Sequence, residues 1–99
     1  MNADVIRLKL NMKPPKTIDG ATIIEWAWSA ASPFGEVPGA DSPEVFGLAI
    51  ATYDGAQFYR LSCDKNWQTV QDGLYDSIND AKDQLPDHYR NVDVIWQPY

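Results

Sequence analysis

VFGLAIATYDGAQFYRLSCD, residues 45–64, predicts a β-hairpin at the centre of a sheet. Residues 45–53 form a mostly apolar run, which is typical of a strand that is buried on both faces. Asp54-Gly55-Ala56 supplies a tight turn, and residues 57–64 return as the second strand. We therefore expect two antiparallel central strands, with the rest of the chain arranged around them.

Four further segments have the residue types of strands. Residues 5–10 alternate between apolar and basic side chains, as a half-buried edge strand does. Residues 21–29 follow a turn at Asp19-Gly20 and contain isoleucines and tryptophans, which favour strand. Trp26 and Trp28 project to the same side, either into the core or as a platform for a partner. Residues 67–71, ended by Asp72-Gly73, and residues 92–96 complete the set.

Residues 74–87 carry an amphipathic pattern, which predicts one helix of about nine residues that ends near Leu85, with Asp76 and Asp87 flanking its ends. Apolar and acidic side chains each recur at helical spacing, on opposite sides: Leu74, Ile78, Ala81 and Leu85 against Asp76, Asp80, Asp83 and Asp87. Ser77 and Asp80 form a pair similar to a capping box at the start, and Pro86 ends the helix. The whole chain, residues 1–99, is thus expected to be a single α+β domain, a mostly antiparallel β-sheet of five or six strands with this helix on one face.

Residues 30–44, AASPFGEVPGADSPE, are expected to form a long loop, because three prolines and two glycines interrupt any periodicity. Loops of this length in small domains are commonly functional or flexible. Phe34 is an aromatic residue in a polar loop, so it either packs back onto the core or waits for a partner. With Glu36, Asp41 and Glu44, it makes the loop a candidate protein-binding surface.

Catalytic and metal-binding patterns are missing from the sequence. Cys63 is the single cysteine and His88 the single histidine, so neither a disulfide nor a Cys/His zinc cluster is expected. No nucleophile elbow and no phosphate-binding glycine loop occurs. We expect no enzymatic activity, no metal and no cofactor; the catalytic alternatives are a Cys63–His88 pair and a close pair of carboxylates.

Charge is divided unevenly along the chain. The net charge is −6, yet residues 1–16 hold four basic side chains and one acidic side chain, so the remainder is strongly acidic. Such a field repels nucleic acids and anionic membranes and favours a basic protein partner. The alternative is that the acidic side chains only keep the protein dissolved. Our predicted protein-binding residues are Asp76, Asp80, Asp83 and Asp87 of the helix, and Phe34, Glu36, Asp41 and Glu44 of the loop.

Three segments carry a resemblance to known proteins: EWAWS at 25–29, YRLSCDKNW at 59–67 and YDSINDAK at 75–82. They resemble small uncharacterised bacterial domains, some of which are similar to immunity proteins that neutralise toxins. The resemblance implies a cytosolic inhibitor that binds and blocks a toxin domain, and it assigns no functional residues. Together with the acidic charge, it predicts stoichiometric binding of a basic toxin or nuclease domain.

Two other functions stay open. One is a phage-type inhibitor of a host nucleic-acid-binding complex, in which carboxylates take the place of phosphates. The other is a structural or self-associating module without catalytic activity, suggested by the apolar terminal strands and the tryptophan pair. The N-terminal residues lack a signal-peptide pattern and no apolar run approaches 18 residues, so we expect a cytoplasmic protein that is a monomer or a weak homodimer.

Overall fold

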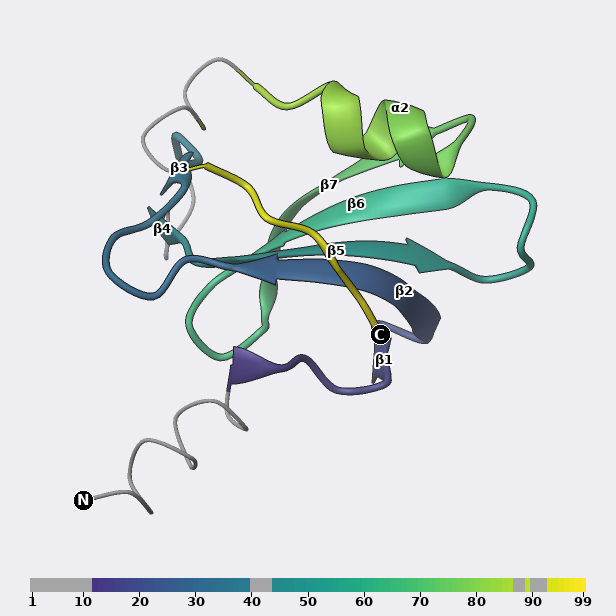
Figure 1. The fold of residues 1–99 in the computed structure, drawn as a ribbon, viewed down its shortest axis with the longest axis horizontal. Helices are drawn as coiled ribbons and strands as arrows, with labels where there is room; N and C mark the ends of the chain where they lie inside the picture. The colour runs from purple at the N-terminus through teal and green to yellow at the C-terminus, as the bar shows by residue number, and fades with distance from the viewer. Residues whose placement is uncertain (1–11, 40–43, 87–88, 90–92) are drawn as a thin grey trace.

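The computed structural model describes residues 12–39, 44–86, 89 and 93–99 (Figure 1). Its main sheet has the strand order β1-β2-β5-β6-β7, with β8 also paired to β2, and every pairing is antiparallel. These strands are β1 (Thr17–Ile18), β2 (Ala21–Trp28), β5 (Gly47–Thr52), β6 (Phe58–Cys63), β7 (Thr69–Tyr75) and β8 (Gln97–Pro98). The mostly antiparallel sheet is confirmed, whereas the strand expected at residues 5–10 lies outside the described residues.

The hairpin predicted from residues 45–64 forms the centre of this sheet as β5 and β6. Leu48, Ala49 and Ile50 of β5 are completely shielded from solvent. Asp54 builds the turn, because its Oδ1 accepts the backbone N–H groups of Ala56 and Gln57 at 2.9 and 3.3 Å. These hydrogen bonds stabilise the carboxylate and lower the pKa of Asp54.

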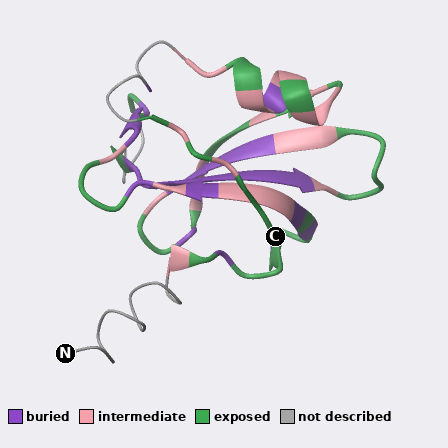
Figure 2. Ribbon diagram, in the orientation of Figure 1, coloured by how far each residue is buried: buried purple, intermediate pink, exposed green. Residues whose placement is uncertain are grey.

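Successive side chains of the strands alternate between two faces of the sheet, and each face is covered. The tryptophan face carries a cluster of Ile18, Ala21, Ile23, Ala49, Ala51, Leu61, Cys63 and Trp67, with Trp26, Trp28 and Tyr59 packed against it. The helix face carries a second cluster of Ala27, Phe34, Val37, Val45, Leu48 and Tyr89, with Val70, Leu85, Val94 and Trp96 packed against it. Figure 2 shows the resulting burial of the central strands.

Trp26 and Trp28 lie on the same face, as predicted, and both contact Trp67. The ring centroid of Trp67 is 6.4 Å from that of Trp26 and 5.5 Å from that of Trp28. Trp67 has a φ of +59°, so it lies in a turn, and the prediction that a strand starts there is wrong. The strand starts instead at Thr69, and it continues through Gly73 to Tyr75 because β6 pairs with it over that whole length.

Helix α2 (Ile78–Asp83) packs over β6 and β7 on the helix face and is shorter than predicted (Figure 1). Ser77 caps it as expected, because its Oγ accepts the backbone N–H of Asp80 at 3.0 Å. Leu74 was assigned to the apolar side of the helix, which is wrong. It lies in β7 opposite Tyr59 and is 56% exposed, because the β6–β7 ladder holds residue 74 in extended backbone.

The described part of residues 30–44 contains regular structure, because β3 (Gly35–Glu36) pairs with β4 (Glu44–Val45). The N–H of Phe34 donates to the carbonyl of Val45 at 2.8 Å, and the Phe34 side chain is only 1% exposed. The predicted role of Phe34 in binding a partner is therefore wrong, and its alternative, packing onto the core, is confirmed.

The last strand is also displaced: residues 93–96 are not strand, and β8 pairs with β2 instead.

Candidate functional site

Cys63 lies in the core and does not have the environment of a nucleophile. Its side chain is completely buried on the tryptophan face, and this burial raises the pKa of the thiol to about 12. A reactive cysteine needs a lowered pKa and access to solvent, and Cys63 has neither. His88, its predicted partner, lies outside the described residues.

We expect the raised pKa of Cys63 to make the fold sensitive to alkali. The folded state holds the thiol proton more tightly than the unfolded chain, whose thiol pKa is near 9.0. The stabilisation is therefore complete below pH 9 and is lost as the pH rises toward 12, at on the order of 1 kcal/mol per pH unit. Urea unfolding between pH 8 and 11 measures this slope. The Cys63→Ala variant should show a shallower slope, and an equal slope in both proteins would contradict the assignment.

The described part of the chain offers neither a metal site nor a membrane helix. No group of three or more histidine, cysteine, aspartate or glutamate side chains in residues 12–39, 44–86, 89 and 93–99 is arranged to hold a metal ion. Nor does any helix in those ranges combine the length and apolar composition that crossing a bilayer requires.

Acidic side chains gather where β7 passes into α2, and we call this region the acidic edge surface. It consists of Asp72, Leu74, Asp76, Asp80 and Asp83 and wraps around the edge of the sheet: Asp72 and Leu74 point to the tryptophan face, whereas Asp80 and Asp83 lie on α2. Asp76 and Asp83 are exposed and Asp80 is half-buried. Among side chains of the described residues one ion pair forms, between Lys82 Nζ and Glu25 Oε1 at 3.0 Å, and it involves none of these carboxylates.

Arg60, the one buried cation among the described residues, forms hydrogen bonds to the backbone of α2. Arg60 of β6 is only 6% exposed, and its Nη1 donates to the carbonyls of Ala81 and Gln84, both at 2.9 Å. Its guanidinium also lies over the ring of Tyr75, 4.8 Å from the centroid. Burial lowers the pKa of Arg60, but an arginine stays charged at any ordinary pH. Arg60 therefore fixes the end of the helix from below.

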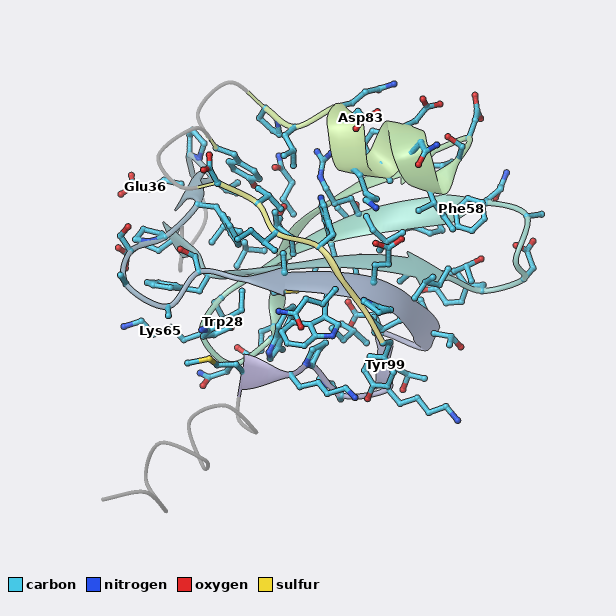
Figure 3. All side chains as sticks on the ribbon, viewed as in Figure 1. Trp28, Glu36, Phe58, Lys65, Asp83 and Tyr99 are labelled. Carbon is cyan, nitrogen blue, oxygen red and sulfur yellow. The ribbon has the colours of Figure 1, made fainter. Side chains whose placement is uncertain are left out.

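The exposed lysines near the tryptophan face lie away from the acidic edge surface. Lys13 Nζ lies 4.3 Å from the ring centroid of Tyr99, and Lys65 Nζ lies 5.0 Å from that of Phe46. In Figure 3, Lys65 and Tyr99 appear on the opposite side of the sheet from Asp83. Lys13 and Lys65 thus lie on the opposite side of the sheet from α2, although Asp72 points to that side as well.

The predicted site residues fall into two separate groups. Glu36 and Glu44 are exposed partners in the β3–β4 pair, whereas Asp76, Asp80 and Asp83 surround α2. Figure 3 shows Glu36 and Asp83 well apart. Asp41 and Asp87 lie outside the described residues.

Sequence reasoning missed that the acidic edge surface includes an exposed apolar side chain, that of Leu74. Leu74 lies opposite Tyr59, and the ring of Tyr59 is 5.6 Å from that of Tyr53, which is 62% exposed. Asp72, Leu74 and Asp76 follow one another at intervals of two residues, and all three are exposed. This two-residue interval was the signal for a strand, but Leu74 also fits the four-residue spacing of the helix pattern.

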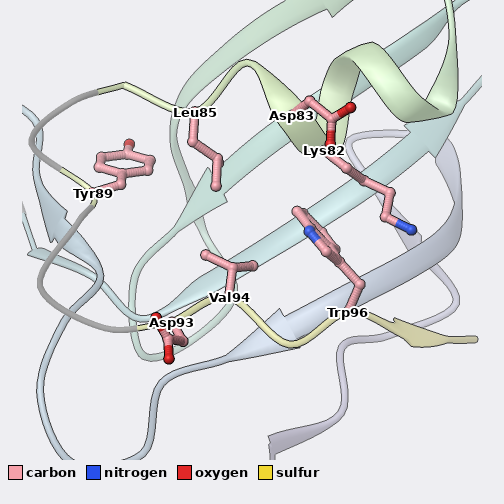
Figure 4. A pocket seen from close by; sticks show the side chains of 7 residues that line it. All are labelled: Lys82, Asp83, Leu85, Tyr89, Asp93, Val94 and Trp96. Carbon is pink, nitrogen blue, oxygen red and sulfur yellow. The ribbon is translucent and has the colours of Figure 1, made fainter.

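A cavity of about 400 Å³ lies between the end of α2 and residues 93–96, on the helix face (Figure 4). Its walls are Lys82, Asp83, Leu85, Tyr89, Asp93, Val94 and Trp96. The ammonium of Lys82 is paired with Glu25, and the hydroxyl of Tyr89 donates to Ser62 Oγ at 3.0 Å.

No protein family matches this chain, and no curated protein or solved structure is significantly similar to it.

Proposed function

We propose that this protein acts by binding a basic protein stoichiometrically, through the acidic edge surface. The observation that supports the proposal is the group of carboxylates around β7 and α2 that has no ion pair among the described residues. Two other carboxylates have partners within the fold: Glu25 pairs with Lys82, and Asp54 accepts backbone hydrogen bonds in its turn. Asp76 and Asp83 do neither within the described part of the chain.

The same surface offers both components of a protein interface. Complementary charge speeds association and selects the partner, while buried apolar and aromatic side chains supply most of the affinity. Leu74 provides exposed apolar area, and Asp72 and Asp76 flank it. A partner that covers Leu74 therefore meets these two carboxylates as well.

The partner class that we propose is a toxin or nuclease domain, with this chain as its cytoplasmic, immunity-like inhibitor. A nuclease must bind phosphates, so its active site and substrate groove carry an excess of lysine and arginine. A surface with several unpaired carboxylates competes for those cations. The proposal requires no catalysis by this chain and no metal or cofactor.

Self-association is the second candidate function, and the position of β7 is the observation that favours it. Among the described strands β7 pairs with β6 alone, and Leu74 is exposed on it. Asp72 opposes this function, because a charge on an edge strand discourages pairing with another copy. Light scattering of the free protein separates the candidates: our proposal expects the monomer mass of 11.1 kDa, whereas twice that mass would favour self-association.

Affinity capture from the source cells tests the proposal. We expect one basic protein in a one-to-one complex, with slowed amide hydrogen exchange across residues 72–83 and unchanged exchange in the Asp54 turn. Capture of an acidic protein would contradict the proposal. So would a complex in which residues 72–83 exchange as fast as in the free protein.

A further inference from the structure

We infer that the cavity between α2 and residues 93–96 receives an arginine side chain of the basic partner. The inference rests on the proposed function and adds to it the chemical group that is recognised. The cavity lies at the end of the same helix that carries Asp80 and Asp83. A partner that contacts Asp80 and Asp83 would therefore also reach the cavity.

The walls of the cavity combine apolar surface with one indole ring. Leu85 approaches from the segment after α2, while Val94 and Trp96 approach from the C-terminal segment (Figure 4). Tyr89 is buried and closes one end, with its hydroxyl bound to Ser62. Together with the charged side chains of Lys82, Asp83 and Asp93, such walls suit a group that has both an apolar or flat surface and a charge.

The charge of the cavity favours a cation. Asp83 and Asp93 are exposed and have no ion pair among the described residues. Among the described residues of the wall Lys82 is the one cation, and its Nζ is 3.0 Å from the carboxylate of Glu25, so that charge is neutralised. The described walls therefore present uncompensated negative charge beside an indole ring.

Arginine fits this combination better than lysine does. A guanidinium is planar, stacks on an indole face and presents several N–H donors to carboxylates. An ammonium is a compact and strongly hydrated charge, which gains less from an aromatic wall. A volume of about 400 Å³ is large enough to receive one long side chain.

The test uses N-acetyl-arginine amide as the probe and the indole N–H signal of Trp96 as the readout, at low ionic strength. The Trp96→Phe variant identifies that signal among those of the other tryptophans. We expect a dissociation constant on the order of 10 mM, as for a ligand of this size. N-acetyl-citrulline amide has nearly the same shape without the charge, and it should bind at least about threefold more weakly.

Matched variants locate the site. Asp93→Asn should weaken arginine binding about threefold, whereas Asp54→Asn, in the turn between β5 and β6, should leave it unchanged. Equal binding of arginine and citrulline would overturn the inference, and so would shifts spread over all exposed carboxylates. If N-acetyl-arginine amide does not bind but a basic protein is still captured, the inference alone is overturned. Probe binding without any basic partner would contradict the proposed function instead.

Discussion

Replacing Arg60 by methionine should lower the free energy of unfolding by about 3 kcal/mol, because two hydrogen bonds from a charged donor are lost at roughly 1.5 kcal/mol each. The carbonyls of Ala81 and Gln84 would lose their donor, and the end of α2 would lose its link to β6. Methionine keeps most of the side-chain length, so the cavity contribution is small. For a domain of this size the loss corresponds to a melting temperature lower by roughly 12 to 24 °C.

Lys65→Met is the matched control for this prediction, since it removes a cation that lies over an aromatic ring at the surface. We expect a change within about 0.5 kcal/mol. Urea unfolding followed by circular dichroism measures both variants. Equal stability of the Arg60 and Lys65 variants would mean that α2 is held by its apolar contacts alone.

Replacing Gly47 by alanine should have a similarly large effect, for a steric reason. A Cβ atom at position 47 would lie 2.6 Å from Cζ3 of Trp67. Trp67 cannot easily retreat, because it is buried against Trp26 and Trp28 and its Nε1 donates to the carbonyl of Met12 at 3.0 Å. Overpacking of a core typically costs up to 3 kcal/mol, and we expect about that loss in urea unfolding.

Gly73→Ala provides the comparison for Gly47. A Cβ at position 73 would lie 2.9 Å from the hydroxyl oxygen of Tyr75, which is the far end of a half-buried side chain on the outermost strand. Because that ring can move aside, we expect a loss of about 1 kcal/mol. A greater loss at Gly73 than at Gly47 would contradict the rigid tryptophan packing described here.

The parts of the fold that follow from local pattern were predictable. The apolar run and turn at 45–64 gave the central hairpin, and Ser77 gave the start of α2, because strand burial and helix capping depend on neighbouring residues. Leu74 could not be placed, since its spacing suits both the helix pattern and the strand alternation. Its pairing with Tyr59, a contact between distant parts of the sequence, decides in favour of strand.

The candidate site was predictable only in its charge. The aspartates around α2 were identified from their spacing, but Phe34 was misplaced because the pairing of β3 with β4 draws it into the core. The cavity depends on Trp96 and Asp93 lying beside α2, and no short-range pattern links those residues. The role of Arg60 was missed for the same reason: its acceptors lie more than 20 residues along the chain.

The most direct measurement of the central claim compares two double variants in binding the captured partner. Asp76→Asn with Asp83→Asn, and Gln57→Lys with Gln68→Lys, each raise the net charge of −6 by two units. All four positions are exposed, so neither pair should disturb the fold. We predict that the first pair weakens binding about tenfold at low salt, and that the second changes it less than about twofold. Equal losses in the two proteins would show that overall charge, and not the acidic edge surface, governs binding.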